Sequence, residues 1–334
     1  MSSDQIGSVT MRRVSALLAG GLLLVPLAGA ASAQPVEIRM GAGPSSEEQI
    51  WLMKARPDLT PNQGKVYTYS MPMFRSGNEK TVALQAGQLD ALTVSTTGAL
   101  FAASKGIPFV VPVAMAREST KTFSTSYLTL AKSDVSLSNL KGKTIGINGY
   151  RQSLELYARI GVRKAGLDPD RDVKWLVVPL PQMGEAVRQG KIDLGVFPST
   201  FAFVALKSGE FRRVFDSAGI SGIEEEFDVA FNSDFLNKNR PVVQAWVDDF
   251  VTVTRYLNDH PVEARKSLLD AKIVQVPADI YLQMTAKDDL LRTPDVIKPD
   301  VEMFKRLQEE LINAKFQENR TDIGKLVDTS FVRN

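Results

Sequence analysis

The sequence predicts an α/β protein made of two similar lobes, each built on a mostly parallel sheet, followed by a helical C-terminal tail. Two observations carry this prediction. Strand-like and helical segments alternate along the chain, which is the pattern of parallel sheets covered by helices. One motif also occurs twice, because "VALQAGQLDALTVS" at residues 82–95 reads like "EAVRQGKIDLGVFP" at residues 185–198. Each copy is a helix that ends at a glycine, then an aspartate and a buried strand.

The first part of the chain after residue 33 begins this alternation. "VEIRMGAG" is strand-like, and "SSEEQIWLMKA" has a helical pattern for which Ser45 and Ser46 are possible N-caps. The elements that follow are a strand "KVYTYSM", a helix "GNEKTVALQAG", a strand "LDALTVS", a helix "TTGALFAASKG" and a strand "PFVVPVAM". This segment therefore supplies most of one lobe.

The alternation restarts with the strand "TSYLTLAK". Three further strands are expected at "KTIGIN", "VKWLVVP" and "IDLGVFP", and four helices at "SLSNLKG", "SLELYARIGVRKAG", "MGEAVRQG" and "STFAFVALKSG". After a strand at "FDVAFN" the pattern becomes helical, with helices expected at 241–258, 262–271, 277–291 and 299–316. No new sheet is expected in that tail.

The repeated motif has a chance explanation, because helix, glycine and strand follow one another in many α/β proteins. The neighbouring elements favour a true repeat. Each copy is followed by a turn that carries hydroxyl groups, "STTG" or "PSTF", and then by another helix. Two similar lobes imply a cleft between them.

Residues 1–33 predict a cleavable secretory signal. A short basic region, "MRRV", precedes an apolar run that is too short and too interrupted by glycine for a good membrane span, and Ala31 and Ala33 form the small-residue cleavage pattern. We expect the mature chain to begin at Gln34 and to be soluble and periplasmic. An uncleaved anchor is the alternative; a true start at Met11 and a choice between general and twin-arginine export stay open.

Composition narrows the possible functions. The 40 basic and 38 acidic residues are spread along all 334 positions without a basic block, so no nucleic acid is expected as a partner. The chain has no cysteine, and its single histidine, His260, stands before Pro261 between two helical patterns, as in a structural turn. Zinc sites, cysteine nucleophiles and histidine-dependent triads need partners that are missing. We therefore expect no metal, no cofactor and no enzymatic activity.

The sequence contains no nucleotide-binding fingerprint. "GKT" at residues 142–144 leads into a strand, and Leu137 stands where a phosphate-binding loop needs glycine. Paired acids, such as "EEE" at residues 224–226, fall in polar turns or on the solvent side of helices, which does not indicate a carboxylate pair facing across a cleft.

Binding is indicated by the loops at the carboxyl ends of the predicted strands. Helix N-termini at these loops offer free N–H groups and the positive end of the helix dipole to anions. Two of the loops place an aromatic residue and then an arginine just before a helix, and exposed surface is the alternative explanation for those arginines. The predicted ligand-binding residues are Ser45, Ser46, Phe74, Arg75, Ser95, Thr96, Tyr150, Arg151, Ser153 and Ser199.

The segment "LKGKTIGINGYRQSLELYARIGVRKAGLDPDRDVKWLVVP", followed by "EAVRQGKIDLGVFPSTFA", resembles the second lobe of substrate-binding proteins of ABC importers, in the nitrate/sulfonate/taurine and thiamine-pyrimidine-precursor group. "ALQAGQLDALTVS" resembles the equivalent part of the first lobe, and "NKNRPVVQAWVDDFVTVTRYLNDHPVEARK" resembles the helical return. The resemblance implies a type II periplasmic-binding-protein fold, with a first lobe at residues 34–123 and 230–334 and a second lobe at 124–229.

The same resemblance implies a function. A monomeric protein of this kind captures a small organic anion, a sulfonate or carboxylate, between its lobes and hands it to an ABC permease in the inner membrane. In this family the turn before the helix at Ser153 commonly cradles the anionic group; here "GYRQS" is bulkier, which favours a larger, flatter acid over nitrate or a simple sulfonate.

We predict that Arg75 and Arg151, one from each lobe, meet the acidic group, and that Phe74 and Tyr150 cover an aromatic body. Two alternatives stay open. One is a ligand-sensing subunit for a membrane receptor, and the other is a pyrimidine-synthase-like enzyme, whose chemistry would call on histidine and cysteine residues that this chain lacks.

Overall fold

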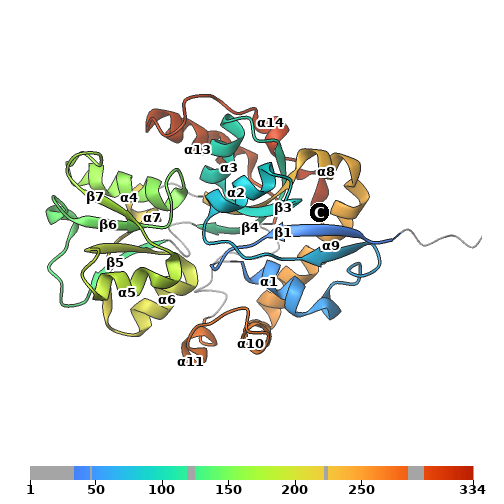
Figure 1. The fold of residues 1–334 in the computed structure, drawn as a ribbon, viewed down its shortest axis with the longest axis horizontal. Coiled ribbons are helices and arrows are strands. Elements are labelled where there is room, and N and C mark those ends of the chain that lie inside the picture. The colour runs from blue at the N-terminus through green and yellow to red at the C-terminus, as the bar shows by residue number, and fades with distance from the viewer. Residues whose placement is uncertain (1–33, 46, 119–124, 222–224, 285–296, 334) are drawn as a thin grey trace, which may run out of the picture. The chain divides into compact units, whose positions relative to one another are not determined.

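Two five-stranded sheets organise the unit that begins at Pro35 (Figure 1). The computed structural model describes residues 34–45, 47–118, 125–221, 225–284 and 297–333, so the predicted signal at 1–33 lies outside the described residues. The first sheet contains β1 (Val36–Gly41), β2 (Tyr67–Ser70), β3 (Ala91–Ser95), β4 (Phe109–Glu118) and β10 (Glu225–Asn232). The second contains β5 (Ser126–Leu130), β6 (Thr144–Ile147), β7 (Lys174–Val177), β8 (Leu194–Phe197) and β9 (Phe211–Asp216).

Each sheet and its helices form one lobe. The first lobe, residues 35–118 and 225–333, has the helices α1 (Glu48–Ala55), α2 (Gly77–Gln85), α3 (Thr96–Ser104), α8 (Ser233–Lys238), α9 (Arg240–Asp259), α10 (Pro261–Asp270), α11 (Ala278–Tyr281), α13 (Val301–Asn313) and α14 (Ile323–Leu326). The second lobe, residues 125–221, has α4 (Ser153–Lys164), α5 (Met183–Arg188), α6 (Ser199–Lys207) and α7 (Ser217–Ser221). None of the helices in these ranges is both long enough and apolar enough to cross a membrane.

The two sheets have the same strand arrangement. Their orders are β2-β1-β3-β10-β4 and β7-β6-β8-β5-β9. In each sheet four strands run in one direction, and only the strand that arrives from the other lobe, β10 or β5, runs antiparallel to its neighbours. The prediction of two lobes with mostly parallel sheets is therefore confirmed. The returning strand β10 joins the first sheet from Glu225, ahead of the boundary expected at residue 230.

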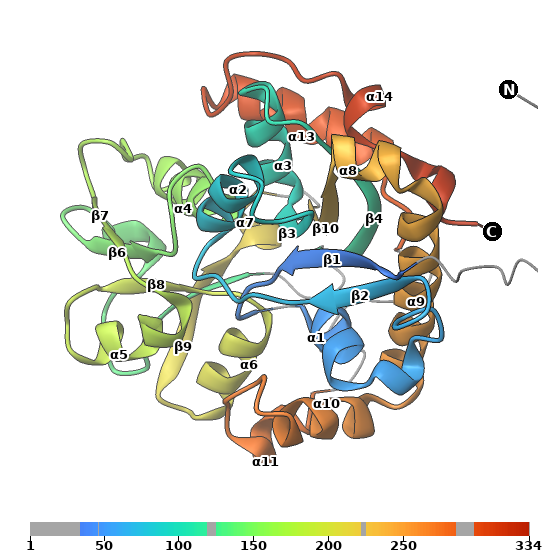
Figure 2. The same ribbon diagram turned by 45° about the vertical axis from the view of Figure 1, so that its right-hand side comes forward.

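The first sheet is buried on both faces, as expected for strands that run parallel between layers of helices. Val229 and Phe231 of β10 face one hydrophobic cluster with residues of α1 and α9, and Ala230 between them faces another with residues of α3 and α13. Figure 2 shows α1 and α10 on one side of β1 and β2, and α3 and α13 on the other. The second lobe has its own cluster, which includes Tyr127 stacked on Phe215 at 4.4 Å.

The repeated aspartate has the same structural task in both lobes. Before β3, the carboxylate of Asp90 accepts a hydrogen bond from the backbone N–H of Arg39 on β1 (2.9 Å) and pairs with the Arg39 guanidinium at 2.7 Å. Before β8, the carboxylate of Asp193 accepts one from the N–H of Thr144 on β6 (2.8 Å) and lies 3.6 Å from the Lys143 ammonium. Each aspartate therefore ties the start of a central strand to the strand beside it.

Three expectations about local structure were wrong. The strand β9 was missed, because a register shift opposite Tyr127 and Leu128 interrupts the alternation of "FRRVFD". Of the helix expected over 277–291, the structure describes residues up to 284, and α11 already ends at Tyr281. Beyond that end, the carbonyl of Met284 accepts a hydrogen bond from the Arg265 side chain. Ser45 does not cap α1, whose N-cap is Glu47, and Ser46 lies outside the described residues.

The turn at His260 was predicted correctly. His260 is the last residue before α10, Pro261 opens that helix, and the backbone N–H of His260 donates to the carbonyl of Tyr256 at 2.8 Å. Its ring lies 5.0 Å from the Tyr256 ring. The single histidine thus joins two helices.

Candidate functional site

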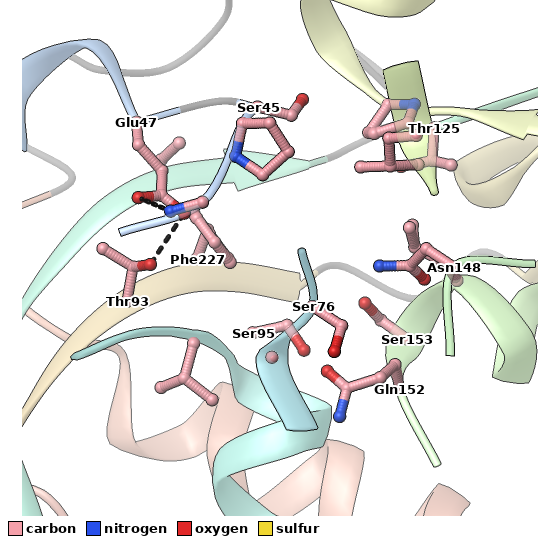
Figure 3. A pocket seen from close by; sticks show the side chains of 18 of the residues that line it. Ser45, Glu47, Ser76, Thr93, Ser95, Thr125, Asn148, Gln152, Ser153 and Phe227 are labelled. Carbon is pink, nitrogen blue, oxygen red and sulfur yellow. Dashed lines mark hydrogen bonds between the residues drawn. The ribbon is translucent and has the colours of Figure 1, made fainter. Parts of the chain in front are cut away.

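A cavity of about 130 Å³ lies between the two lobes (Figure 3). The first lobe lines it with Gly43, Pro44, Ser45, Glu47, Arg75, Ser76, Gly77, Lys80, Thr93, Val94, Ser95, Ala116, Arg117, Glu118, Glu226 and Phe227. The second lobe adds Thr125, Asn148, Gln152, Ser153, Leu154, Leu180 and Pro198. A molecule in this cavity would contact both lobes at once.

Five helices begin at the cavity wall. The residues that precede their first turns all line the cavity: Glu47 for α1, Ser76 for α2, Ser95 for α3, Gln152 for α4 and Pro198 for α6. Because each helix begins at the wall, the positive end of its dipole and its free N–H groups lie at the cavity. The helices span eight to twelve residues. This arrangement favours an anion.

Only two of these five helices have a side-chain cap. The hydroxyl groups of Ser76 and Ser95 accept hydrogen bonds from first-turn N–H groups of α2 and α3, at 3.3 and 3.2 Å. Glu47, Gln152 and Pro198 provide no such side-chain bond to α1, α4 and α6. One helix of the first lobe and both helices of the second therefore keep these N–H groups free of a side-chain cap.

A buried ion pair forms part of the wall of the first lobe. The Lys80 ammonium lies 3.2 Å from Oε1 of Glu47, and that oxygen also accepts a hydrogen bond from the Thr93 hydroxyl (2.7 Å), which the Lys80 ammonium contacts as well. The other Glu47 oxygen accepts from the Gly43 N–H at 2.7 Å. Burial lowers the pKa of Lys80, and the attraction of Glu47 opposes that change. The pair is locally neutral, so Lys80 offers little net charge to an anion.

A second ion pair, between the half-buried Arg117 and the buried Glu226, lies where β4 and β10 meet. The Arg117 guanidinium is 2.5 Å from Oε1 of Glu226, whose other oxygen accepts from the N–H of Asp300 at 3.2 Å. Burial raises the pKa of Glu226 from 4.5 to about 7, although Arg117 acts in the opposite direction.

Glu118, at the end of β4, connects the two lobes. Its carboxylate accepts hydrogen bonds from the Thr125 hydroxyl at 2.5 Å and the Ser217 hydroxyl at 2.8 Å, both in the second lobe. Burial raises the pKa of Glu118. This carboxyl therefore lies at the wall of the cavity and beside the crossing between the lobes.

Some polar groups of the wall have no partner among the described residues. The carboxamide oxygen of Asn148 and Nε of Arg117 are buried and make no hydrogen bond. Arg75 is exposed at the cavity, and only its backbone N–H is bonded, to Glu79 at 3.0 Å. These groups can interact with a ligand without breaking an existing bond to the described chain.

Four of the predicted binding residues line the cavity, namely Ser45, Arg75, Ser95 and Ser153. Ser46 and the side chain of Ser199 lie outside the described residues. The other four are placed elsewhere: Phe74 packs at the edge of a core cluster, the Thr96 hydroxyl donates to Asp228 (3.0 Å), Tyr150 is 45% exposed, and Arg151 faces the first lobe.

The position of Arg151 has a physical cause. Its backbone is in the left-handed region, at φ 59°, and its N–H donates to Glu155 at 2.6 Å. Its guanidinium is directed to the rings of Phe101 (5.9 Å) and Phe316 (5.0 Å). Arg151 therefore makes a contact between the lobes and is not among the residues that line the cavity, and its contact with a ligand stays a prediction.

Several polar residues of the wall, including Lys80 and Asn148, were not among the predicted binding residues. Lys80 had a detectable signal, because it stands three and four residues before Ala83 and Leu84 on the buried side of α2, where a lysine is unusual. Asn148 directly follows β6, at the carboxyl end of a strand, and could have been included on the same grounds as Ser153.

Two lobes with one shared strand order and a cavity between them define the fold of two-lobed periplasmic binding proteins. Among solved structures, the chain is similar to the alkanesulfonate-binding protein of Xanthomonas axonopodis pv. citri bound to MOPS (TM-score 0.72, 16% identity, 89% of this chain and 99% of that one). It is also similar to the periplasmic aliphatic sulphonate-binding protein of Escherichia coli (0.67, 18%, 87% and 97%). A third is the periplasmic nitrate-binding protein of Synechocystis PCC 6803 (0.72, 10%, 89% and 87%).

The chain matches the NMT1-like family over residues 31–273 and belongs to that family. The family resemblance found in the sequence is thereby confirmed. No curated protein sequence matches the chain. Within the part of the chain that the structure describes, no group of three or more His, Asp or Glu side chains is arranged to hold a metal ion.

Proposed function

We propose that this protein is the solute-binding component of an ABC importer, which captures a small organic anion in the cavity between its lobes and delivers it to a membrane permease. The observation that carries the proposal is that five helices from both lobes begin at the cavity wall. An anion there would gain from the N–H groups of both lobes, which favours the arrangement in which the lobes enclose it.

The size and charge of the cavity support a compact monoanion. Its volume of about 130 Å³ is well below the ~300–1,000 Å³ of pockets for drug-sized ligands. The lining contains three acids and three bases, and Lys80 and Arg117 are paired with Glu47 and Glu226. Arg75 is therefore the cation that we assign to the anionic group, together with the N-terminus of α4 at Ser153.

The comparisons support the transport role and the compartment. The similar solved structures include periplasmic proteins that bind sulfonates and nitrate. Together with the signal pattern at residues 1–33, this supports export to the periplasm. Capture without chemical change is supported by the absence of cysteine from the sequence and by the structural position of the single histidine, His260.

A thermal-shift screen tests the proposal. The chain from Gln34 onward is unfolded by heat with alkanesulfonates, short carboxylates or nitrate, and with neutral alcohols and amides of the same size. We expect one or more anions to raise the midpoint in a concentration-dependent way and the neutral compounds to have no effect. Anions that fail at millimolar concentration, or neutral compounds that stabilise equally, would contradict the proposal.

Titration calorimetry on Arg75→Ala sharpens this test. Losing a charge-assisted contact should weaken the best anion by about ten- to a hundredfold. Arg255→Ala, which removes an exposed arginine of α9 that does not line the cavity, is the matched control and should bind like the wild type.

A further inference from the structure

The only Asn-Gly step in the sequence lies at the cavity wall, where Asn148 directly follows β6 and Gly149 comes next. Glycine has no Cβ, so its backbone nitrogen is little hindered and its backbone turns freely. In such a step the backbone nitrogen of the glycine can attack the side-chain carboxamide carbon of the asparagine. This attack requires a carboxamide that can turn, an N–H that is not already bonded, and access to water.

The structure leaves both reacting groups without a bond that would hold them. Among the described residues, neither the amide nitrogen of Asn148 nor the backbone N–H of Gly149 donates a hydrogen bond, and the Asn148 carboxamide oxygen accepts none. Asn148 is half-buried, and Figure 3 shows its amide nitrogen directed into the space between the lobes. The carboxamide can therefore turn without breaking a bond to the described chain, and its nitrogen can leave into the cavity.

Other asparagines of the chain have carboxamides that are held in place. Asn232, which precedes the small Ser233, accepts hydrogen bonds at its side-chain oxygen from two backbone N–H groups of α8, at 3.0 and 3.1 Å. Asn139 accepts from one backbone N–H at 2.7 Å and donates to a backbone carbonyl at 3.0 Å. Such bonds must break before the carboxamide can turn, so Asn148 differs from these residues both in its neighbour and in its freedom.

We propose that Asn148 is a site of spontaneous deamidation and that the carboxylate formed there weakens the binding of an anion in the cavity. The Gly149 nitrogen forms a bond to Cγ of Asn148, and the side-chain amide leaves as ammonia with the proton of the Gly149 N–H, which gives a cyclic imide. Water then opens the ring. Breaking the bond between the Gly149 nitrogen and Cγ gives aspartate, and breaking its bond to the backbone carbonyl carbon gives isoaspartate. Either product carries a carboxylate.

The new charge would lie in the wall that carries none at present. All ionisable residues of the lining belong to the first lobe. A carboxylate at position 148 would share the cavity with the anionic group of the ligand, and like charges enclosed together repel strongly because little water screens them. The effect on binding rests on the proposed function, whereas the deamidation itself does not.

Tryptic peptide mapping tests the modification. Trypsin releases residues 144–151, "TIGINGYR", in which Asn148 is the only side-chain amide, so the exchange of its NH₂ for OH is read directly from the peptide mass. The chain from Gln34 onward is incubated for weeks in mildly alkaline buffer. Amide loss should be several-fold faster at Asn148 than at Asn232, and Gly149→Ala should slow it several-fold. The added Cβ would lie 3.6 Å from Nδ2 of Asn78, an ordinary contact, so this variant should fold.

Titration calorimetry with ethanesulfonate, propanoate and nitrate tests the effect on binding. Asn148→Asp should bind the best of these anions about ten- to a hundredfold more weakly than the wild type. Asn148→Ala, which removes the carboxamide without adding charge, should bind it more tightly than Asn148→Asp. Asn313→Asp, which adds the same charge at an exposed carboxamide at the end of α13, is the control and should bind like the wild type. Incubated wild-type protein should lose binding capacity as Asn148 deamidates, and incubated Gly149→Ala should keep it.

The outcomes separate the modification from the function. Amide loss at Asn148 that is no faster than at Asn232, or that is unchanged in Gly149→Ala, overturns the modification and leaves the proposed function standing. Wild-type affinity in Asn148→Asp overturns the effect on binding. If the fresh wild type binds none of the anions, the proposed function fails and the effect on binding fails with it, while the peptide masses still decide the deamidation.

Discussion

The two lobes share their architecture and differ in the chemistry that they bring to the cavity. Both sheets have the same strand order, and in both an aspartate ties a central strand to its neighbour. However, all six ionisable residues of the lining come from the first lobe, whereas the second lobe contributes only uncharged residues such as Asn148 and Ser153. The repeat therefore preserves the parts that hold the fold together, and the binding surface has diverged.

The largest expected effect comes from the charged wall of the first lobe. Lys80→Met leaves Glu47 buried without its cation, so the free energy of unfolding should fall by about 3–5 kcal/mol. Thr125→Val, in the uncharged wall, should cost about 1–2 kcal/mol. Urea denaturation measures both. The double variant Lys80→Met/Glu47→Gln should recover part of the lost free energy of unfolding. Equal losses for Lys80→Met and Thr125→Val would contradict the difference between the charged and the uncharged wall.

The repeated aspartates provide the next comparison. Asp90→Ala removes the acceptor for three hydrogen bonds from Arg39 and should destabilise the protein by about 2–3 kcal/mol. Asp193→Ala removes one such bond and a 3.6 Å ion pair, so about 1 kcal/mol is expected. Chemical denaturation of both variants checks the order, and a larger loss for Asp193→Ala would show that the two sites are not equivalent.

The dependence of stability on pH should also trace to the first lobe. Burial raises the pKa of Glu226 to about 7, so the folded protein keeps this proton where the unfolded chain, with a pKa near 4.5, has lost it. Stability from this group is thus present below about pH 4.5 and is lost as pH rises toward 7. Glu226→Gln cannot titrate there, so its stability relative to the wild type should rise between pH 4.5 and 7.

Denaturation of wild type and Glu226→Gln side by side gives this result. Glu118, whose pKa burial also raises, is present in both proteins and cancels from the difference. A difference in stability that stays constant across the range would mean that Glu226 is ionised in the folded state throughout.

The smallest expected effect concerns the contact between lobes. Arg151→Gly removes the guanidinium from the rings of Phe101 and Phe316, and glycine suits the positive φ at this position. Binding of the best anion should weaken about two- to fivefold, as expected for an exposed cation–π contact. The order in which the protein prefers different anions should not change, because Arg151 does not line the cavity. Calorimetry that finds an altered order of preference would place Arg151 at the ligand.

The sequence was most informative where local pattern determines structure. Alternating strands and helices and the repeated "G-x-(aliphatic)-D" segment predicted both lobes, because glycine caps and buried strands are local features. β9 was missed because its alternation is broken by a register shift, which depends on the partner strand β5.

The site was only partly predictable for a related reason. Loops at the carboxyl ends of strands do contribute to the cavity wall, and Ser45, Arg75, Ser95 and Ser153 line it. The direction of a side chain within such a loop depends on backbone conformation and on distant contacts. Arg151 turns toward Phe316, which lies 165 residues further along the chain, and no pattern near Arg151 indicates this.

Hydrogen–deuterium exchange with and without a bound anion tests the central claim most directly. The probe is the anion with the largest thermal shift, added at saturation to the chain from Gln34 onward. If the anion is held between the lobes by helix N-termini, exchange should slow at the first turns of α2 and α3 in the first lobe and of α4 in the second. Saturating binding with protection confined to one lobe, or to regions away from these turns, would contradict the account.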